Sequence, residues 1–251
     1  MTKSWRFNLQ DDAYGFPYHY LPNIMADGRI VIYQSLSWGL RYLTYMTYIR
    51  DRILTNKPQS ICDVGCGDGR LLHMLRGVPR RVGVDLSSRA ISFARAFDPN
   101  AEWYCCPVQE VPGTYDIVTC VETLEHVPNK EIPDFIASLR ARTTSKGRLI
   151  VCVPTVNLPL DPKHHRHYTL ELLRDQLKHH FAIQEAVWLF RIGTTTSILN
   201  RLLTNRIFVL QHAPTLRIIW RIHLRWSFFG TPSDAADLLI IASPCDGMEL
   251  H

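Results

Sequence analysis

Short apolar runs alternate with amphipathic segments through most of the chain. Apolar runs at 61–64, 82–85, 102–106, 115–121, 148–153, 181–189 and 236–242 predict seven strands. Apolar positions at helical spacing predict helices over 37–54, 90–97, 133–141 and 169–177. The alternation predicts an α/β protein with a doubly wound, mostly parallel seven-stranded sheet. Ligands of such sheets bind beyond the carboxyl ends of the strands, so residues that follow strands are the first candidates for function.

Two segments interrupt this regular pattern. Residues 1–35 are rich in aromatic residues, Pro and Gly and have no clear period, so 1–56 is predicted to form an N-terminal aromatic and helical cap. Between the sixth and last strands, residues 190–233 are too long for a simple turn and form a predicted helical insertion, with Pro214 dividing it and a helix over 216–229. The core then spans 57–189, and 234–251 supply the last strand and the tail.

Three polar motifs follow strands. The first is Asp63-x-Gly65-x-Gly67-x-Gly69, a strand, a tight turn and a helix that would bring backbone N–H groups close to a ligand. Its spacing differs from the dinucleotide fingerprint, which has two residues before the third Gly. The second strand ends at Asp85, an acid suited to accept hydrogen bonds from vicinal ribose hydroxyls. The fourth strand runs into a Glu-Thr-Leu-Glu-His sequence at 122–126.

In order and spacing, these motifs resemble those of class I S-adenosylmethionine-dependent methyltransferases, over roughly residues 57–188. The run at 122–126 is similar to that of ubiquinone-biosynthesis O-methyltransferases. The resemblance implies the Rossmann-like methyltransferase fold and S-adenosyl-L-methionine as the cofactor. The residues that it implies for cofactor binding are Asp63, Gly65, Cys66, Gly67, Gly69, Asp85, Leu86, Gln109 and Glu122. Pro107 stands where the family often has an Asp for the adenine, so main-chain groups or Gln109 would recognise that base.

Histidines are the candidate catalytic groups, because a hydroxyl acceptor benefits from a base with a pKa near neutrality. His126 follows the fourth strand, and His164, His165 and His167 form a cluster that resembles the family's His-containing loop. We therefore predict methyl transfer to a hydroxyl of a small molecule or sugar, which a lipid could carry. By the same resemblance, Tyr18, Tyr20 and Trp38 are candidates for a lid over the cofactor.

Two other functions compete with this prediction. Glu122, Glu125, His126 and His165 could hold a metal ion, as in the enzymes that methylate the terminal ribose of small RNAs. The same run occurs in metal-free relatives, and no separate RNA-binding module is visible, so a site without metal is preferred and nucleic acid is not the expected partner. The second alternative is a non-catalytic protein that binds the cofactor and a partner.

Charge changes the interpretation of the insertion. The net charge is only +5, but Arg191, Arg201, Arg206, Arg217, Arg221 and Arg225 are interleaved with large apolar residues. This segment could cover the substrate pocket, contact a membrane surface through 206–229, or bind phosphate. The sequence contains seven cysteines and no Cys-x-x-Cys pair, and no signal peptide or spanning segment is visible. The expected location is cytoplasmic, with the inner face of a membrane as an alternative; the oligomeric state stays open.

Overall fold

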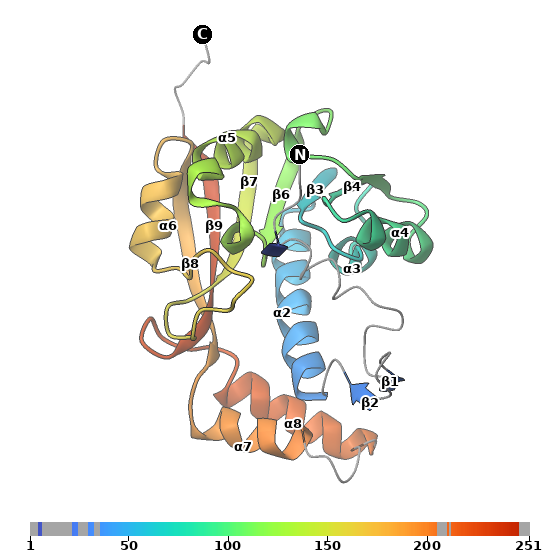
Figure 1. The fold of residues 1–251 in the computed structure, drawn as a ribbon, viewed down its shortest axis with the longest axis vertical. Helices are drawn as coiled ribbons and strands as arrows, with labels where there is room; N and C mark the ends of the chain where they lie inside the picture. Colours follow the sequence, from blue (N-terminus) through green and yellow to red (C-terminus); the bar gives the residue numbers. More distant parts are fainter. Residues whose placement is uncertain are drawn as a thin grey trace.

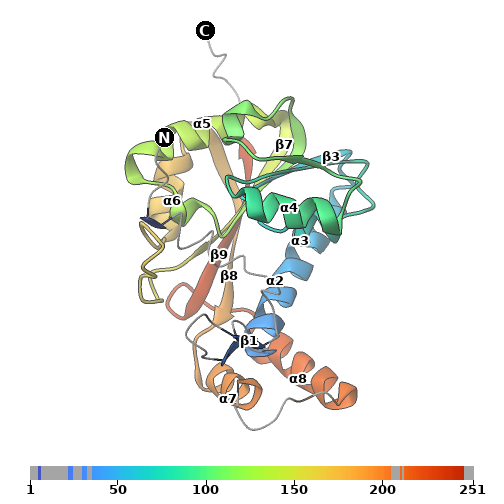
Figure 2. The same ribbon diagram turned by 45° about the vertical axis from the view of Figure 1, so that its right-hand side comes forward.

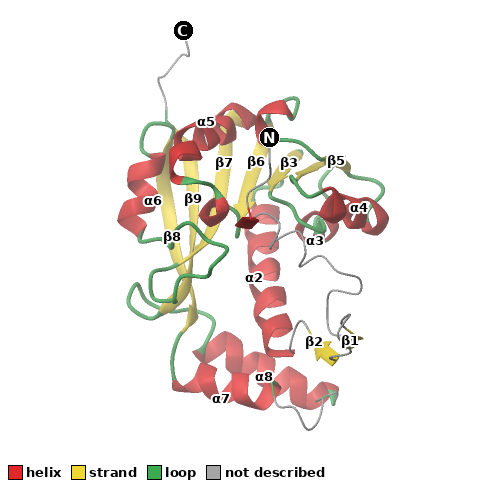
Figure 3. Ribbon diagram, viewed as in Figure 1, coloured by secondary structure: helices red, strands yellow, loops and turns green. Residues whose placement is uncertain are grey.

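The fold was analysed in a computed structural model, which describes residues 5–6, 22–24, 30–32, 36–204, 210 and 212–245. Its centre is a seven-stranded sheet of order β5-β4-β3-β6-β7-β9-β8, in which β9 runs antiparallel to both of its neighbours (Figure 1, Figure 3). The strands are β3 Ser60–Val64, β4 Arg80–Val84, β5 Glu102–Tyr104, β6 Tyr115–Val121, β7 Thr143–Pro154, β8 Phe181–Arg191 and β9 Ala235–Pro244. All seven predicted strands are therefore confirmed.

Some predicted boundaries were wrong. Strand β7 begins at Thr143 instead of Arg148, because the pairing with β6 is irregular: Tyr115 pairs with Thr143, but Ile117 pairs with Arg148. Residues 144–147 lie inside this irregularity. Strand β5 ends at Tyr104, two residues early. The N-terminal segment also contains two short strands that were not predicted, β1 Pro22–Ile24 and β2 Ile30–Ile32, which pair with each other.

Helices flank the sheet, and capping residues fix where two of them begin. The hydroxyl of Ser87 accepts a hydrogen bond from the backbone N–H of Ala90, and that of Thr169 accepts one from Leu172. The helices are α2 Leu36–Thr55, α3 Arg70–His73, α4 Ser88–Phe97, α5 Ile132–Arg142, α6 Leu170–Leu177, α7 Thr194–Leu203 and α8 Ala213–Trp226. Short 3-10 turns are η1 Val108–Glu110, η2 Leu124–His126 and η3 Asn129–Glu131.

Helices on both faces of the sheet confirm the doubly wound architecture, because alternate residues of each strand enter two separate cores. On one face, Ile136 of α5 and Leu173 of α6 pack with Val118 and Val151. On the other, residues of α2, α3 and α4 pack with the neighbouring strand positions, among them Ile117 and Ile150. Both cores are apolar, so the sheet is a rigid support for the loops at its ends.

The insertion forms a helical pair that stands beyond the ends of β8 and β9 (Figure 1, Figure 2). Helix α7 was not predicted, and α8 begins at Ala213 instead of Leu216, because Pro214 lies in its first turn, where a missing N–H costs nothing. The chain leaves and returns through a narrow neck, in which Phe190 N donates to Phe228 O (2.6 Å) and Arg191 N to Ser227 O (2.8 Å).

Helix α2 supports the inserted pair. Leu199 and Leu203 of α7 and Ile219 of α8 form a small core with Leu36 and Leu40 in the first turns of α2. Strand β8 runs parallel to β7, since both are antiparallel to β9, and α7 begins three residues after β8 ends. The insertion is therefore attached at the carboxyl edge of the sheet, where the three sequence motifs also lie.

Candidate active site

The glycine loop after β3 has a backbone that only glycine adopts freely. Gly65, Gly67 and Gly69 have φ values of +75°, +54° and +77°. At two of these glycines, neighbouring side chains also leave no room for a Cβ atom. A Cβ on Gly65 would lie 2.1 Å from Oγ1 of Thr123, and one on Gly69 would lie 2.3 Å from Cη2 of Trp103. The loop is thus packed against the turn that follows β6 on one side and against β5 on the other.

Asp85 connects the glycine loop to the end of β4. Its Oδ2 accepts a hydrogen bond from the backbone N–H of Gly67 (3.0 Å), and its Oδ1 accepts one from Ser87 (2.8 Å). Two backbone N–H groups thus hold this carboxylate in place at the carboxyl end of β4. Leu86 beside it is 51% exposed, which leaves an apolar surface next to the carboxylate.

The other predicted cofactor residues lie around this centre. Asp63 is buried, burial raises its pKa to about 7, and its Oδ1 accepts a hydrogen bond from Thr119 Oγ1 (2.6 Å). Cys66 is buried in the loop, and Gln109 is exposed on η1. Trp38 lies on α2 and stacks on Tyr42, whereas Tyr18 and Tyr20 lie outside the described residues. The roles of these residues stay predictions.

Hydrogen bonds fix the tautomers of three of the predicted histidines. Nδ1 of His126 donates to the carbonyl of Lys163 (3.3 Å), and Nδ1 of His167 donates to that of Leu158 (3.1 Å). With Nδ1 of His167 as a donor, its Nε2 accepts the Nδ1–H of His164 at 2.9 Å. His126 and His164 therefore each keep an unprotonated Nε2, the form that a general base requires.

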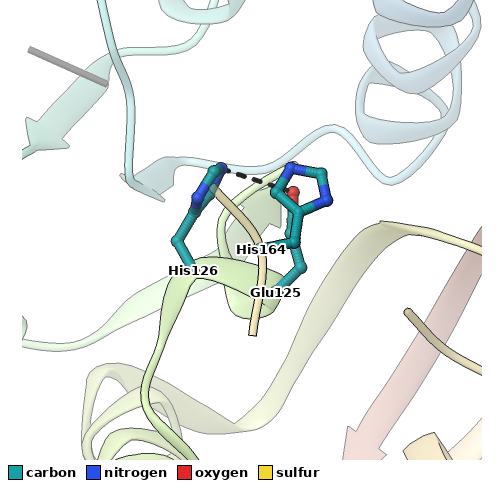
Figure 4. A group of neighbouring side chains, drawn as sticks. All are labelled: Glu125, His126 and His164. Atoms are coloured by element: carbon teal, nitrogen blue, oxygen red, sulfur yellow. Dashed lines mark ion pairs between the residues drawn. The ribbon is translucent and has the colours of Figure 1, made fainter. Parts of the chain in front are cut away.

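Glu125 lies beside these two imidazoles (Figure 4). It is fully buried, neither carboxyl oxygen has a hydrogen-bond partner, and Oε1 is 3.7 Å from Nε2 of His126. Burial raises the pKa of Glu125 to about 8 and lowers the pKa of His126. Burial also lowers the pKa of His164 to about 4. At neutral pH the group is thus a protonated acid beside two neutral imidazoles.

The structure brings together a different set from the metal ligands considered above. Ligand atoms of Glu125, His126 and His164 all lie within 4.8 Å of one another. His165 contributes its backbone N–H, which donates to Glu125 O (2.8 Å), and is not a member of this group. The interval between the two motifs did not reveal which histidine of the cluster would meet His126, because that depends on the path of the loop over 155–168.

Arg166 holds the loop over η2 and was not identified from the sequence. Its Nη1 donates to Leu124 O (3.0 Å) and its Nε to Asn129 Oδ1 (2.6 Å), and Nη2 donates to Val127 O. These bonds bind both sides of the turn that carries Glu125 and His126. Arginines in basic loops are common, so no sequence signal separated Arg166 from its neighbours.

A second polar group, in which Asp237 is buried and Arg41 is partly exposed, lies beside the first. Nη2 of Arg41 on α2 donates to both carboxylate oxygens of Asp237 on β9, at 2.7 and 2.6 Å, and its guanidinium lies over the Phe190 ring. Glu122 has a φ of +51° and a buried Oε1 without a partner, and its pKa is well above the usual range because of burial and of Asp237. Neither Arg41 nor Asp237 was identified from the sequence, because neither lies near a motif.

The strand order, the antiparallel β9 and the glycine loop after β3 define a class I methyltransferase. The model of the methyltransferase domain family matches residues 40–193, more than half of the chain, and the protein belongs to that family. The prediction of a class I S-adenosylmethionine-dependent methyltransferase is thereby confirmed at the level of family and fold, as is the cofactor of the class.

The similarity to curated relatives extends over fewer residues than the family match. A ubiquinone biosynthesis O-methyltransferase of Albidiferax ferrireducens is 38% identical over 81 residues, which are 28% of this chain and 32% of that protein. Its counterpart from Thiobacillus denitrificans is 34% identical over 98 residues, 36% of this chain and 41% of that one. The chain thus spans less than half the length of these relatives.

Solved structures share the fold over nearly the whole chain. Magnesium protoporphyrin IX methyltransferase from Synechocystis, crystallised with S-adenosylmethionine, has a TM-score of 0.59 and 14% identity and covers 96% of this chain and 98% of its own. The 1,6-didemethyltoxoflavin-N1-methyltransferase of Burkholderia thailandensis has a TM-score of 0.57 and 17% identity, with 96% of this chain and 87% of its own covered. In the described part of the present chain, no helix is long and apolar enough to cross a membrane.

Proposed function

We propose that the protein transfers a methyl group from S-adenosylmethionine to a hydroxyl group of a small molecule or a sugar. The observation that carries this proposal is the pair of unprotonated Nε2 atoms, on His126 and His164, beside the buried Glu125. Thr123, in the same turn, lies against the glycine loop, so the base and the cofactor loop are neighbours. The named function of the ubiquinone O-methyltransferase relatives supports the choice of a hydroxyl.

The residues at the carboxyl edge fit this cofactor. The Asp85 carboxylate, held at the end of β4 by the backbone of Gly67, would accept hydrogen bonds from ribose hydroxyls, and the exposed Leu86 offers an apolar surface for a base. The closed turn at Gly65 to Gly69 would hold the aminoacyl part, with Asp63 behind it. When bound, S-adenosylmethionine supplies a methyl group on an already activated sulfur. The chain then has to align the acceptor and exclude water, and positioning of this kind is worth about 7–11 kcal/mol.

His126 would receive the proton of the acceptor hydroxyl at Nε2. Its lowered pKa keeps the imidazole neutral at physiological pH, so nearly all of the protein is ready to accept a proton. General-base catalysis of this kind contributes about 10²–10⁴-fold to a rate. Glu125, 3.7 Å away, would interact with the charged imidazole once the proton has moved.

A pair of matched variants tests this role. His126→Gln should lower kcat by about 10²–10⁴-fold and leave the dissociation constant of S-adenosylmethionine unchanged. His179→Gln changes an exposed histidine beyond α6 and should leave both unchanged. Radiolabelled cofactor with a panel of phenols, sugars and cell extracts identifies the acceptor. Full activity of His126→Gln would refute the assignment, and tight cofactor binding without turnover on any acceptor would favour the non-catalytic alternative.

Metal-assisted methylation of a ribose 2′-hydroxyl at an RNA 3′ end is the second candidate. The gathering of ligand atoms from Glu125, His126 and His164 favours it. Two imidazoles and one carboxylate suit a transition-metal ion better than Mg²⁺. Activity that a chelator abolishes and Mn²⁺ restores, on an RNA acceptor, would support this candidate. Activity that is indifferent to chelators would exclude it.

A cytoplasmic location is the proposal for the cell compartment. All seven cysteines are free thiols, and four of them, Cys62, Cys66, Cys120 and Cys152, are buried. Free thiols are maintained in reducing compartments, which supports the cytoplasm. Fractionation of cells that express the protein, with and without high salt, tests this location and would also detect a loosely attached membrane fraction.

A further inference from the structure

The residues from 186 to 233 contain no acidic side chain. The stretch lies between Glu185 and Asp234 and carries six arginines, of which Arg191 pairs with Asp234 (Nε to Oδ2, 3.4 Å). A surface helix of a soluble domain normally mixes charges of both signs on its outer face. The insertion is therefore a concentrated source of positive potential at one end of the molecule.

The outer face of α8 joins this charge to exposed apolar side chains. Arg217, Arg221 and Arg225 recur every fourth residue and are exposed. Ile218 is 57% exposed and Ile222 is 37% exposed, and both lie directly beside the arginine row on the helix. An outward helical face usually carries polar residues, and the described part of the chain leaves Ile218 more than half exposed and Ile222 about one third exposed.

The opposite face of α8 already has its partners. Ile219 is buried against α7 and α2, and His223 is buried against the ring of Phe190. The helix is therefore anchored by its inner face and cannot rotate to bury the isoleucines. Trp226, 56% exposed at the end of α8, lies one turn after Ile222, and the guanidinium of Arg225 lies 4.9 Å from the centre of its ring. Trp and Arg are residues that favour the boundary between water and lipid.

We infer that the outer face of α8 docks on an anionic lipid surface. The arginines match lipid phosphates, and the isoleucines and Trp226 match the boundary of the acyl chains. RNA fits the charge and could stack one base on Trp226, but two exposed isoleucines offer no ring for stacking and suit acyl chains better. A second copy of the same face fits the apolar residues but would place three arginines against three others.

The position of α8 gives the docking a consequence. The helix belongs to the pair that stands beyond the carboxyl edge of the sheet, the edge that carries the glycine loop and His126 (Figure 1, Figure 2). A lipid surface on α8 would bring a lipid-linked acceptor to the same end of the molecule. Only this consequence rests on the proposed function; the docking itself does not.

Co-sedimentation of the full chain with vesicles tests the inference without any acceptor. Binding to phosphatidylcholine–phosphatidylglycerol vesicles should exceed binding to phosphatidylcholine vesicles and should weaken as salt rises. Arg217→Gln/Arg221→Gln/Arg225→Gln should bind the anionic vesicles about a hundredfold more weakly. Ile218→Ser/Ile222→Ser should bind about tenfold more weakly with the charge unchanged.

A triple variant of equal charge change is the control. Lys130→Gln/Lys146→Gln/Arg174→Gln removes three exposed cations elsewhere and should bind vesicles like the wild type. The melting temperature and the cofactor affinity of each variant establish that it is folded. Absence of wild-type binding, or equal losses in the control and in the α8 variants, would overturn the inference.

The competing partners give distinct results. Tight binding of an RNA oligonucleotide that survives Ile218→Ser/Ile222→Ser, without vesicle binding, would overturn the inference in favour of nucleic acid. A dimer in solution that these two substitutions dissociate, without vesicle binding, would assign the face to a second copy. Each of these results leaves the methyl-transfer proposal untouched, because that proposal is tested by turnover.

Discussion

The contact between Gly65 and Thr123 predicts how the glycine loop responds to a single methyl group. Gly65→Ala would place a Cβ 2.1 Å from Oγ1, 2.5 Å from Cγ2 and 2.8 Å from Cβ of Thr123. The left-handed backbone, φ +75°, adds a cost of its own, about 1–2 kcal/mol for a residue with a side chain. Overpacking costs about 1–3 kcal/mol, so the free energy of unfolding should fall by about 2–5 kcal/mol.

Thermal and urea denaturation measure this loss. For a chain of this size, 1 kcal/mol corresponds to about 2–4 °C, so the melting temperature of Gly65→Ala should fall by about 4–20 °C. Gly77→Ala is the matched control, because nothing lies within 4 Å of its added Cβ and its φ is not left-handed. Calorimetry with S-adenosylmethionine should also find weaker binding to Gly65→Ala and unchanged binding to Gly77→Ala.

A second substitution separates the two causes. Thr123→Gly removes all three atoms that the new Cβ would meet, so Gly65→Ala should cost about 1–3 kcal/mol less in a Thr123→Gly background. The remaining cost would be that of the backbone conformation. If Gly65→Ala is as stable as Gly77→Ala, the loop does not have the conformation described here. If the double variant recovers nothing, the contact with Thr123 is not the source of the loss.

Four further predictions concern charged groups. Asp85→Asn should weaken cofactor binding about 10–100-fold by calorimetry, because charged hydrogen bonds of this kind are worth about 1.5–3 kcal/mol, and unchanged affinity would remove Asp85 from the site. Arg81→Gln should lower the free energy of unfolding by about 3–5 kcal/mol, since it leaves Asp98 buried without its cation; a loss below 1 kcal/mol would contradict the buried ion pair. The acidic limb of the pH profile of kcat/KM should lie below 6.5, because burial lowers the pKa of His126 and the imidazole stays neutral down to that lowered pKa. An acidic limb above 6.5 would contradict the assignment of His126 as the base. Burial raises the pKa of Glu125 to about 8, so the free energy of unfolding of the wild type should fall as the pH rises from about 4.5 to about 8. In urea denaturation at pH 8, Glu125→Gln should therefore be more stable than the wild type. A less stable variant at that pH would show that Glu125 is a carboxylate in the folded protein.

The sheet was predictable because each strand is a local signal. Buried parallel strands are continuous apolar runs, and the residues after them mark the functional edge. The helix starts at Ser87 and Thr169 are likewise local, because one side chain satisfies the backbone N–H three residues later. The start of β7 was missed because its first residues pair irregularly, and the pairing partner is not visible in the segment itself.

The site was only partly predictable, because its polar groups come from distant parts of the chain. Asp85 and the glycines belong to motifs with fixed spacing. Arg41 and Asp237, however, are 196 residues apart, and each lies among apolar neighbours that indicate a helix or a strand and nothing more. Which histidine of the cluster lies beside His126 likewise depends on the path of the loop over 155–168. Hydrogen bonds of Arg166 hold that loop in place, and they bring His164, not His165, to the site. Tertiary contacts of this kind leave no period in the sequence.

The narrow neck at Phe190 and Arg191 has a consequence for how such proteins diversify. The insertion leaves β8 and returns at backbone positions that are hydrogen-bonded to each other. The register between β8 and β9 therefore does not depend on the helices of the insertion. Sequences of other lengths and characters can therefore replace the insertion without altering the catalytic edge.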